Sequence, residues 1–146
     1  MQRKQYPYTP KFMNKYIGNY PLKMRSSWEL SFAKWLDYNE NVVRWSNEKH
    51  AIRYYDPMQG KQRRYFPDFY AAIRNKEGKV VEYIIEIKPK KETKPPRKTS
   101  AQSKKTKMYQ EATYITNSAK FEAAQNYCKK MGYCWKIISE QELFKK

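Results

Sequence analysis

The sequence is poor in the residues that metal–thiolate, secreted and membrane proteins need. Its two cysteines, Cys128 and Cys134, and its single histidine, His50, fall short of the roughly four ligands of a structural zinc site. We therefore expect neither zinc nor a disulfide framework. No apolar run follows Met1 and no stretch reaches the length of a membrane span, so we expect neither a secretion signal nor a membrane segment.

Acidic residues are also scarce. The 146 residues include 14 Asp+Glu against 31 Lys+Arg, which gives a formal net charge of +17. So large an excess repels itself in a compact fold and is typical of proteins whose partner is a polyanion. Tyrosine, present 14 times, packs its ring in a core and still offers a hydroxyl to phosphate. This composition favours a nucleic-acid-binding protein, with a basic structural protein as the plainer alternative.

The apolar pattern predicts a single α/β domain over residues 1–146, with a central mixed sheet flanked by helices. Strands are expected at residues 42–45, 51–55, 64–73 (interrupted by Pro67), 80–88 and 134–138. Helices are expected from Ser26 to Asn39, from Asn117 or Ser118 to Gly132, and after Ser139; residues 104–114 also favour a helix. The central hairpin should be antiparallel, and the last strand should return parallel after a helical crossover.

Two helix starts carry capping-box patterns, Ser26 with Glu29 and Ser139 with Glu142. The buried stripe expected on the first helix is Trp28, Phe32, Trp35 and Leu36. Two segments lack any apolar period. Residues 1–22 are interpreted as an irregular, basic N-terminal arm that lies on the domain or reaches a partner, and residues 89–107 as a basic flexible loop.

The residues that indicate chemistry lie at the ends of two predicted strands. Asp68 begins one strand and Glu86 ends the next, so an antiparallel hairpin brings their carboxylates together. Glu86 and Lys88 are two residues apart and therefore leave the same face of the strand. Two carboxylates and the backbone carbonyl of Ile87 suit Mg²⁺, which prefers oxygen ligands, with Mn²⁺ able to replace it.

Such a site can hydrolyse a phosphodiester bond with water that the metal activates, without a covalent intermediate. Lys88 would orient the water and stabilise the developing charge. Glu29, on the first helix, is a candidate fourth member that binds a second metal or a metal-bound water. Glu48 is a further candidate carboxylate, although a surface charge is the simpler interpretation, and His50 fits packing better than general-base catalysis.

Three segments resemble the PD-(D/E)XK nuclease superfamily, which has the restriction-endonuclease-like fold: Arg25–Glu29, Tyr65–Phe69 and Ile84–Pro89. Within it the pattern most resembles the head completion nucleases of tailed phages, and more distantly the nuclease subunit of heteromeric transposases. The resemblance runs from about Tyr8 to Leu143 and includes residues 117–124, which resemble the helix after the active-site strands. It implies that Glu29, Asp68, Glu86 and Lys88 form the catalytic set.

The resemblance further implies a DNA endonuclease that works late in virion assembly, on packaged DNA or DNA ends, in the host cytoplasm and the virion head. Expected partners are double-stranded DNA and phage head or neck proteins, for a monomer or homodimer. The basic side chains expected to contact DNA are Arg25, Lys90, Lys91, Lys94, Arg97, Lys98, Lys104, Lys105, Lys107 and Lys120.

Each residue also has a plainer explanation when it is taken singly. Glu29 is explained by helix capping, Asp68 by turn chemistry, and Glu86 with Lys88 by a solvated strand face. Three other functions stay open: a non-catalytic DNA-binding protein of the phage head or neck, a transposase-type end-cleaving subunit, and RNA processing. No base-reading motif is present, so little sequence specificity is expected.

Overall fold

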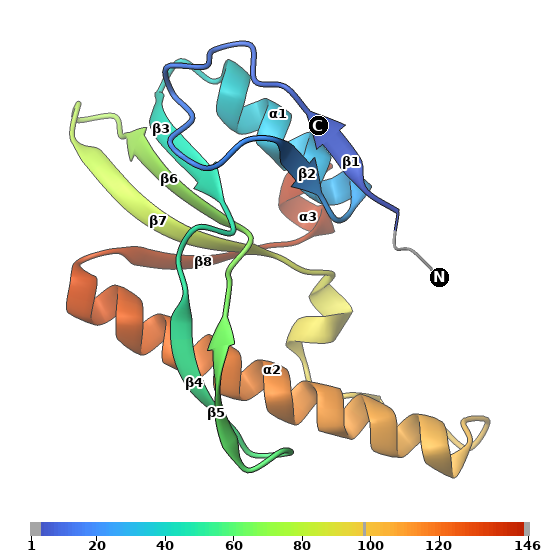
Figure 1. Ribbon diagram of the computed structural model, residues 1–146. Coiled ribbons are helices and arrows are strands. Elements are labelled where there is room, and N and C mark those ends of the chain that lie inside the picture. Colours follow the sequence, from blue (N-terminus) through green and yellow to red (C-terminus); the bar gives the residue numbers. More distant parts are fainter. Residues whose placement is uncertain (1–3, 98, 145–146) are drawn as a thin grey trace.

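A four-stranded mixed sheet forms the centre of the molecule (Figure 1). In this computed structural model, which describes residues 4–97 and 99–144, the strand order is β3-β6-β7-β8. The strands are β3 Val42–Asn47, β6 Phe69–Arg74, β7 Val80–Ile87 and β8 Cys134–Ile138. The β3–β6 and β6–β7 pairs are antiparallel and the β7–β8 pair is parallel, so the predicted mixed sheet is confirmed.

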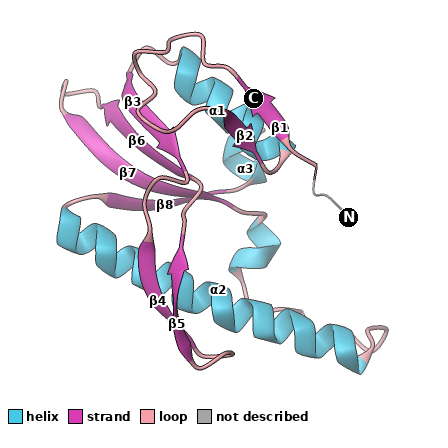
Figure 2. Cartoon of the chain, in the orientation of Figure 1, coloured by secondary structure: helices cyan, strands magenta, loops and turns pink. Residues whose placement is uncertain are grey.

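Helices cover both faces of this sheet (Figure 2). They are α1 Ser27–Tyr38, α2 Lys104–Met131 and α3 Glu140–Leu143, together with the 3₁₀ turn η1 Lys90–Thr93. Side chains alternate along β6, because successive residues of a strand point to opposite faces. Phe69 packs in a cluster with Phe32 and Leu36 of α1, whereas Tyr70 packs in a cluster with Cys128 of α2. Among the described residues, no helix has the length and apolarity needed to cross a membrane.

The start of α1 is fixed by Ser26, whose Oγ accepts a hydrogen bond from the Glu29 N–H at 3.1 Å. The other half of the expected capping box would be a hydrogen bond from the Ser26 N–H to the Glu29 carboxylate. That carboxylate lies instead with those of Glu48 and Asp68. The predicted stripe is right for the buried Phe32 and Leu36. It is wrong for Trp35, which is 47% exposed and stacks on Phe32 at 5.5 Å between ring centroids.

The prediction of a helix starting at Asn117 or Ser118 is wrong, because α2 runs unbroken from Lys104 to Met131. Ser103 caps it by accepting from the Thr106 N–H at 3.1 Å. No proline or glycine interrupts residues 104–131, so nothing ends the helix before Gly132, which adopts the left-handed φ of 79°. The predicted capping box at Ser139 and Glu142 is confirmed at α3.

The single strand predicted over residues 64–73 is wrong, because Pro67 divides it into two strands with different partners. β5, Lys61–Tyr65, pairs only with β4, Ile52–Asp56, in a separate antiparallel ribbon. One face of this ribbon packs on α2, where Tyr54 and Tyr65 surround Ala124. Proline cannot donate to a ladder, so the chain leaves the ribbon at Pro67 and enters the central sheet after it.

The expected irregular arm at residues 1–22 contains a strand. β1, Tyr6–Tyr8, pairs with β2, Leu22–Met24, and Pro7 is tolerated because β1 is an edge strand. The fully buried Asp37 holds this segment on the domain. Its carboxylate accepts hydrogen bonds from the Tyr8 hydroxyl and from the N–H groups of Lys11 and Phe12, the last two at 2.7 and 3.0 Å. Residues 1–3 of the arm lie outside the described residues.

Candidate active site

Three neighbouring strand ends bring three carboxylates into one row. Asn47 of β3 pairs with Phe69 of β6, which in turn pairs with Ile85 of β7. The next residue towards the same edge of the sheet is Glu48 after Asn47, Asp68 before Phe69 and Glu86 after Ile85. The Glu48 N–H donates to the Asp68 carbonyl at 3.1 Å, which extends the β3–β6 ladder by one step.

Glu29 adds a fourth carboxylate from the first turn of α1. Each of Glu29, Glu48 and Asp68 offers an oxygen atom within 4.8 Å of the other two. Among the described residues this is the group of three with metal-ligand spacing, so Glu48, interpreted as a surface charge from the sequence, lies inside the site. Its backbone has the positive φ of 50°, which is uncommon outside glycine and often occurs at functional sites.

Glu86 lies outside that group of three but lines the same cavity as Glu29 and Asp68. The cavity measures about 400 Å³, and its wall includes Glu29, Asp68, Glu86 and Lys88, together with Ile87. The structure therefore brings together all four residues of the expected catalytic set.

Hydrogen bonds fix the orientation of the two strand carboxylates. The Ile87 N–H donates to Asp68 Oδ2 at 2.8 Å, and the buried Tyr65 hydroxyl donates to Glu86 Oε1 at 2.6 Å. The other oxygen of Glu86 lies 3.8 Å from Lys88 Nζ. Ile87, expected to offer its carbonyl to a metal, thus has a second task, because its N–H orients Asp68.

Burial and mutual repulsion dominate the electrostatics of the site. Burial, followed by the negative charges of Glu86 and Glu29, raises the pKa of Asp68 well above its usual 3.8. Burial also raises the pKa of Glu86, although the Tyr65 hydrogen bond and the Lys88 charge oppose it. Burial raises the pKa of Glu48 as well, against the charge of Arg25, whose Nε lies 2.9 Å from Glu48 Oε1.

This donor set fits a hard divalent cation. Mg²⁺ and Mn²⁺ prefer carboxylate oxygens, and those of Glu29, Glu48 and Asp68 already lie close together. Holding several buried like charges together costs free energy that a bound cation removes.

Lys120 of α2 approaches the site from the side of Tyr65. Its Nζ lies 5.7 Å from the centroid of the Tyr65 ring and 5.9 Å from that of Tyr54. Burial, followed by the charge of Lys88, lowers the pKa of Lys120. Predicted as a DNA contact, this residue lies close to the catalytic set as well.

The other predicted DNA contacts lie on different elements. Arg25 pairs with Glu48; Lys90 and Lys91 lie on η1; Lys94 and Arg97 follow it; Lys104, Lys105 and Lys107 form the start of α2. The predicted flexible loop at 89–107 therefore holds η1 and the first residues of α2. Lys98 lies outside the described residues. His50 packs against the rings of Tyr70, Tyr127 and Tyr133, which agrees with its interpretation as a packed side chain.

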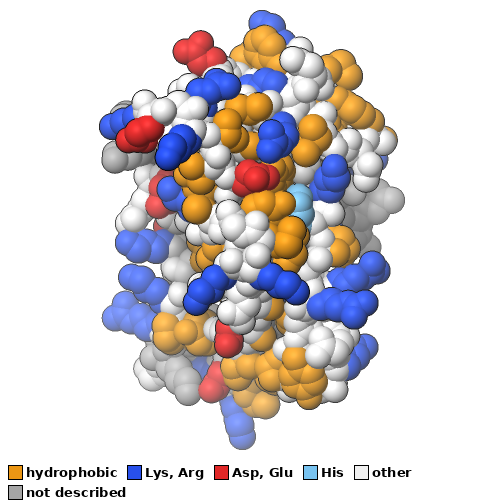
Figure 3. All heavy atoms as spheres, turned by 90° about the vertical axis from the view of Figure 1, so that its left-hand side faces the viewer, with side chains coloured by type: hydrophobic (Ala, Val, Ile, Leu, Met, Phe, Trp, Pro, Cys, Tyr) orange, Lys and Arg blue, Asp and Glu red, His pale blue; other side chains and the backbone are white. Residues whose placement is uncertain are grey.

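Sequence reasoning missed a basic surface on the β4–β5 ribbon. Arg53 and Tyr55 of β4 are exposed, and they pair with the exposed Arg64 and Gln62 of β5. Two arginines directly opposite each other repel, which an anionic partner would relieve. The alternating, β-rich pattern of residues 51–55 was the available signal in the sequence. Figure 3 shows how widely Lys and Arg spread over one face of the molecule, with few acidic side chains among them.

Comparison with known proteins agrees with this site. A family model described as "TnsA-like endonuclease N terminal" matches residues 39–140. The chain is also 39% identical over 141 residues to the head completion nuclease of Enterobacteria phage T4, a match that covers 93% of this chain and 91% of that protein.

Proposed function

The chain belongs to the TnsA-like endonuclease family, within the PD-(D/E)XK nucleases, and is an endonuclease; we propose that it hydrolyses DNA with Mg²⁺ as its cofactor. One observation carries the mechanism: a single cavity is lined by Glu29 of α1, Asp68 just before β6, Glu86 of β7 and Lys88 just after it. Isolated surface charges or helix capping would not require that convergence.

Glu29, Glu48 and Asp68 would hold the cation, with Glu86 as a further ligand beside them. When bound, the ion lowers the pKa of a water and neutralises charge on the scissile phosphate. Lys88 places a positive charge where negative charge develops on the phosphate oxygens. Tyr65 and the Ile87 N–H keep Glu86 and Asp68 in fixed orientations, so little reorganisation accompanies the reaction.

Two basic elements would contact the DNA backbone. Lys104, Lys105 and Lys107 occupy the first turn of α2, which carries no acidic residue. Cations there are repelled by the positive end of the helix dipole. A phosphate bound at this end would offset that repulsion. The outer face of the β4–β5 ribbon, Arg53, Tyr55, Gln62 and Arg64, is the second element. It is an antiparallel ribbon of the kind that fits the DNA major groove.

The biological setting follows from the phage relative. We infer that the chain acts on packaged DNA or DNA ends in virion assembly, in the host cytoplasm and the virion head, beside head or neck proteins. The extensive match to the phage nuclease supports this setting over transposition. One site cuts one strand, so a double-strand break requires two protomers or two visits.

The test is cleavage of supercoiled plasmid in Mg²⁺, followed on a gel. We expect nicked and linear DNA from the natural protein, none in EDTA, and restored cutting in Mn²⁺. Asp68→Ala should abolish cutting, whereas Glu77→Ala, which removes an exposed carboxylate in a turn, should leave it unchanged. Equal cutting by the Asp68→Ala protein, or DNA binding without cleavage in either metal, would reject the mechanism. A matched RNA substrate distinguishes DNA cutting from RNA processing.

A further inference from the structure

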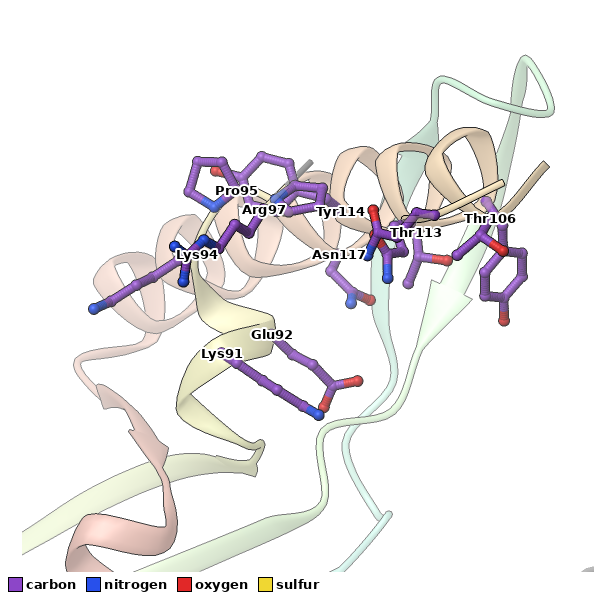
Figure 4. A pocket seen from close by; sticks show the side chains of 13 residues that line it. Lys91, Glu92, Lys94, Pro95, Arg97, Thr106, Thr113, Tyr114 and Asn117 are labelled. Atoms are coloured by element: carbon purple, nitrogen blue, oxygen red, sulfur yellow. The ribbon is translucent and has the colours of Figure 1, made fainter. Parts of the chain in front are cut away.

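A second cavity, larger than the catalytic one, lies between η1, the segment that follows it, and α2 (Figure 4). We call it the α2 cavity; its volume is about 590 Å³. This is within the range of ~300–1,000 Å³ of pockets that bind small organic groups. The residues that matter here are Lys91, Pro95, Arg97, Tyr109, Tyr114 and Asn117.

The walls of the α2 cavity include aromatic rings and positive charge, together with the carboxylate of Glu92. Tyr109 and Tyr114 supply the aromatic rings, Pro95 supplies an apolar ring, and Lys91 and Arg97 supply the cations. Aromatic faces with arginine and lysine beside them are the common means of holding unpaired nucleobases and their phosphates. Stacking on aromatic rings and contacts between cations and phosphates do not require base pairing, so these walls suit single-stranded nucleic acid.

Among the polar side chains that line the α2 cavity, Asn117 is the buried one. Its side chain is only 8% exposed, lines the cavity and projects from α2 on the side of η1 (Figure 4). Within the described part of the chain, no hydrogen bond engages its amide. Its amide atoms are not among the side-chain atoms cut off from solvent, so the amide is available to a ligand that enters the cavity. Since an amide both donates and accepts, it can pair with the edge of any nucleobase.

The α2 cavity and the catalytic cavity share one lining residue. Glu92 of η1 lines both. The chain passes from Lys88 through Pro89 directly into η1, so the strand that carries Glu86 and Lys88 leads to the wall of the α2 cavity. A DNA strand with a phosphate in the catalytic cavity therefore has the α2 cavity beside it.

We infer that the α2 cavity receives an unpaired nucleotide of the DNA strand that enters the active site. Its base stacks against Tyr109 or Tyr114 and pairs with the Asn117 amide, and its phosphate contacts Lys91 or Arg97. A base in an intact duplex is stacked on its neighbours and paired with its partner, so it could enter only at the cost of unstacking and unpairing. The enzyme then prefers DNA with an overhang, flap or frayed end near the cut. This inference rests on the proposed DNA cleavage.

The experiment measures equilibrium binding to labelled DNA by fluorescence anisotropy, with Asp68→Ala protein so that the DNA stays intact. Three substrates are compared: a blunt duplex, the same duplex with a short single-stranded overhang, and that overhang built from abasic nucleotides. We expect the overhang to bind about tenfold more tightly than the blunt duplex, which corresponds to one stacked base. The abasic overhang should lose that advantage. A fluorescent 2-aminopurine in the overhang should be quenched at the position that enters the cavity.

Variants assign the effect to the α2 cavity. Adding Tyr109→Ala, at a side chain that is 73% exposed, should remove the overhang advantage and leave blunt-duplex binding unchanged. Asn117→Ala should act likewise, with its melting temperature as a check on folding. Tyr38→Ala, which removes an exposed tyrosine from α1, is the matched control and should keep the advantage.

Three results would overturn the inference: no preference for the overhang, an abasic overhang that binds as tightly as the natural one, or an equal loss in Tyr38→Ala and Tyr109→Ala. None of them affects the proposed function, which depends on whether Asp68→Ala abolishes plasmid cleavage. Conversely, an overhang preference that depends on Tyr109 in a protein that never cuts DNA would leave the nucleotide site standing and remove the nuclease mechanism.

Discussion

The hydrogen bond from Tyr65 to Glu86 offers the sharpest test of how the site is organised. Tyr65→Phe removes one oxygen atom, which lies 2.6 Å from Glu86 Oε1, and keeps the ring. Both side chains are only 6% exposed, so water cannot readily replace the lost donor. Burial, with the Glu86 charge next, raises the pKa of the Tyr65 phenol, so the hydroxyl remains a donor at every working pH.

The expected magnitude follows from the kind of bond. A hydrogen bond to a charged group contributes ~1.5–3 kcal/mol. We expect a loss of stability of ~1.5 kcal/mol, because the raised pKa of Glu86 lets this carboxyl take up a proton when its donor is gone. Catalysis should suffer more, because a loosely held ligand typically costs about 10- to 100-fold in metal affinity or rate.

The assay is the initial rate of plasmid nicking across a Mg²⁺ titration, beside the melting temperature of each protein. Tyr70→Phe is the matched control. Tyr70 is also buried, at 4% exposure, and its hydroxyl also contacts a glutamate, Glu82, but it lies outside the catalytic cavity. This control should lose stability and keep its nicking rate and Mg²⁺ dependence. Equal nicking by Tyr65→Phe and the natural protein, or equal loss in both variants, would refute a positioning role for Tyr65.

Three further predictions concern the charges of the site and of the DNA surface. Lys88→Met should lower the nicking rate by about 100- to 1,000-fold while the rise in melting temperature on adding Mn²⁺ persists; an unchanged rate would remove Lys88 from the mechanism. Asp68→Asn should abolish cutting yet raise the melting temperature in EDTA at pH 8, because the raised pKa of Asp68 means that its ionised form destabilises the folded state above that pKa. This gain should shrink as the pH falls toward the usual Asp value of 3.8, and a gain independent of pH would contradict the repulsion described for the site. Changing both Arg53 and Arg64 to Gln should reduce the slope of log K against log salt for duplex DNA by about 2, and an unchanged slope would place the duplex elsewhere.

The sequence was sufficient for the parts of the site that depend on local periodicity. Ser26 marks the start of α1, and the period of two places Glu86 and Lys88 on one face of β7. The hairpin between Asp68 and Glu86 follows from a turn of ordinary length, and the parallel return of β8 follows from its helical crossover.

What the sequence could not supply depends on contacts between distant segments. Glu48 joins the site because β3 continues to Asn47, two residues beyond the expected end, and pairs with β6. Local propensity does not choose a strand's partner, so the separation of β5 from β6 was also missed. The N-terminal segment is fixed by the buried Asp37, a residue at the far end of α1 that has no local signal for this task.

The most direct measurement of the central claim is the anomalous scattering of crystals soaked in Mn²⁺ at a concentration that supports plasmid cleavage. The convergence of Glu29, Glu48, Asp68 and Glu86 predicts a peak within coordination distance of Asp68 and Glu29 that is absent from crystals of Asp68→Ala protein. A cleaving protein whose Mn²⁺ peaks all lie away from these carboxylates, or whose peak is unchanged in the variant, would contradict it.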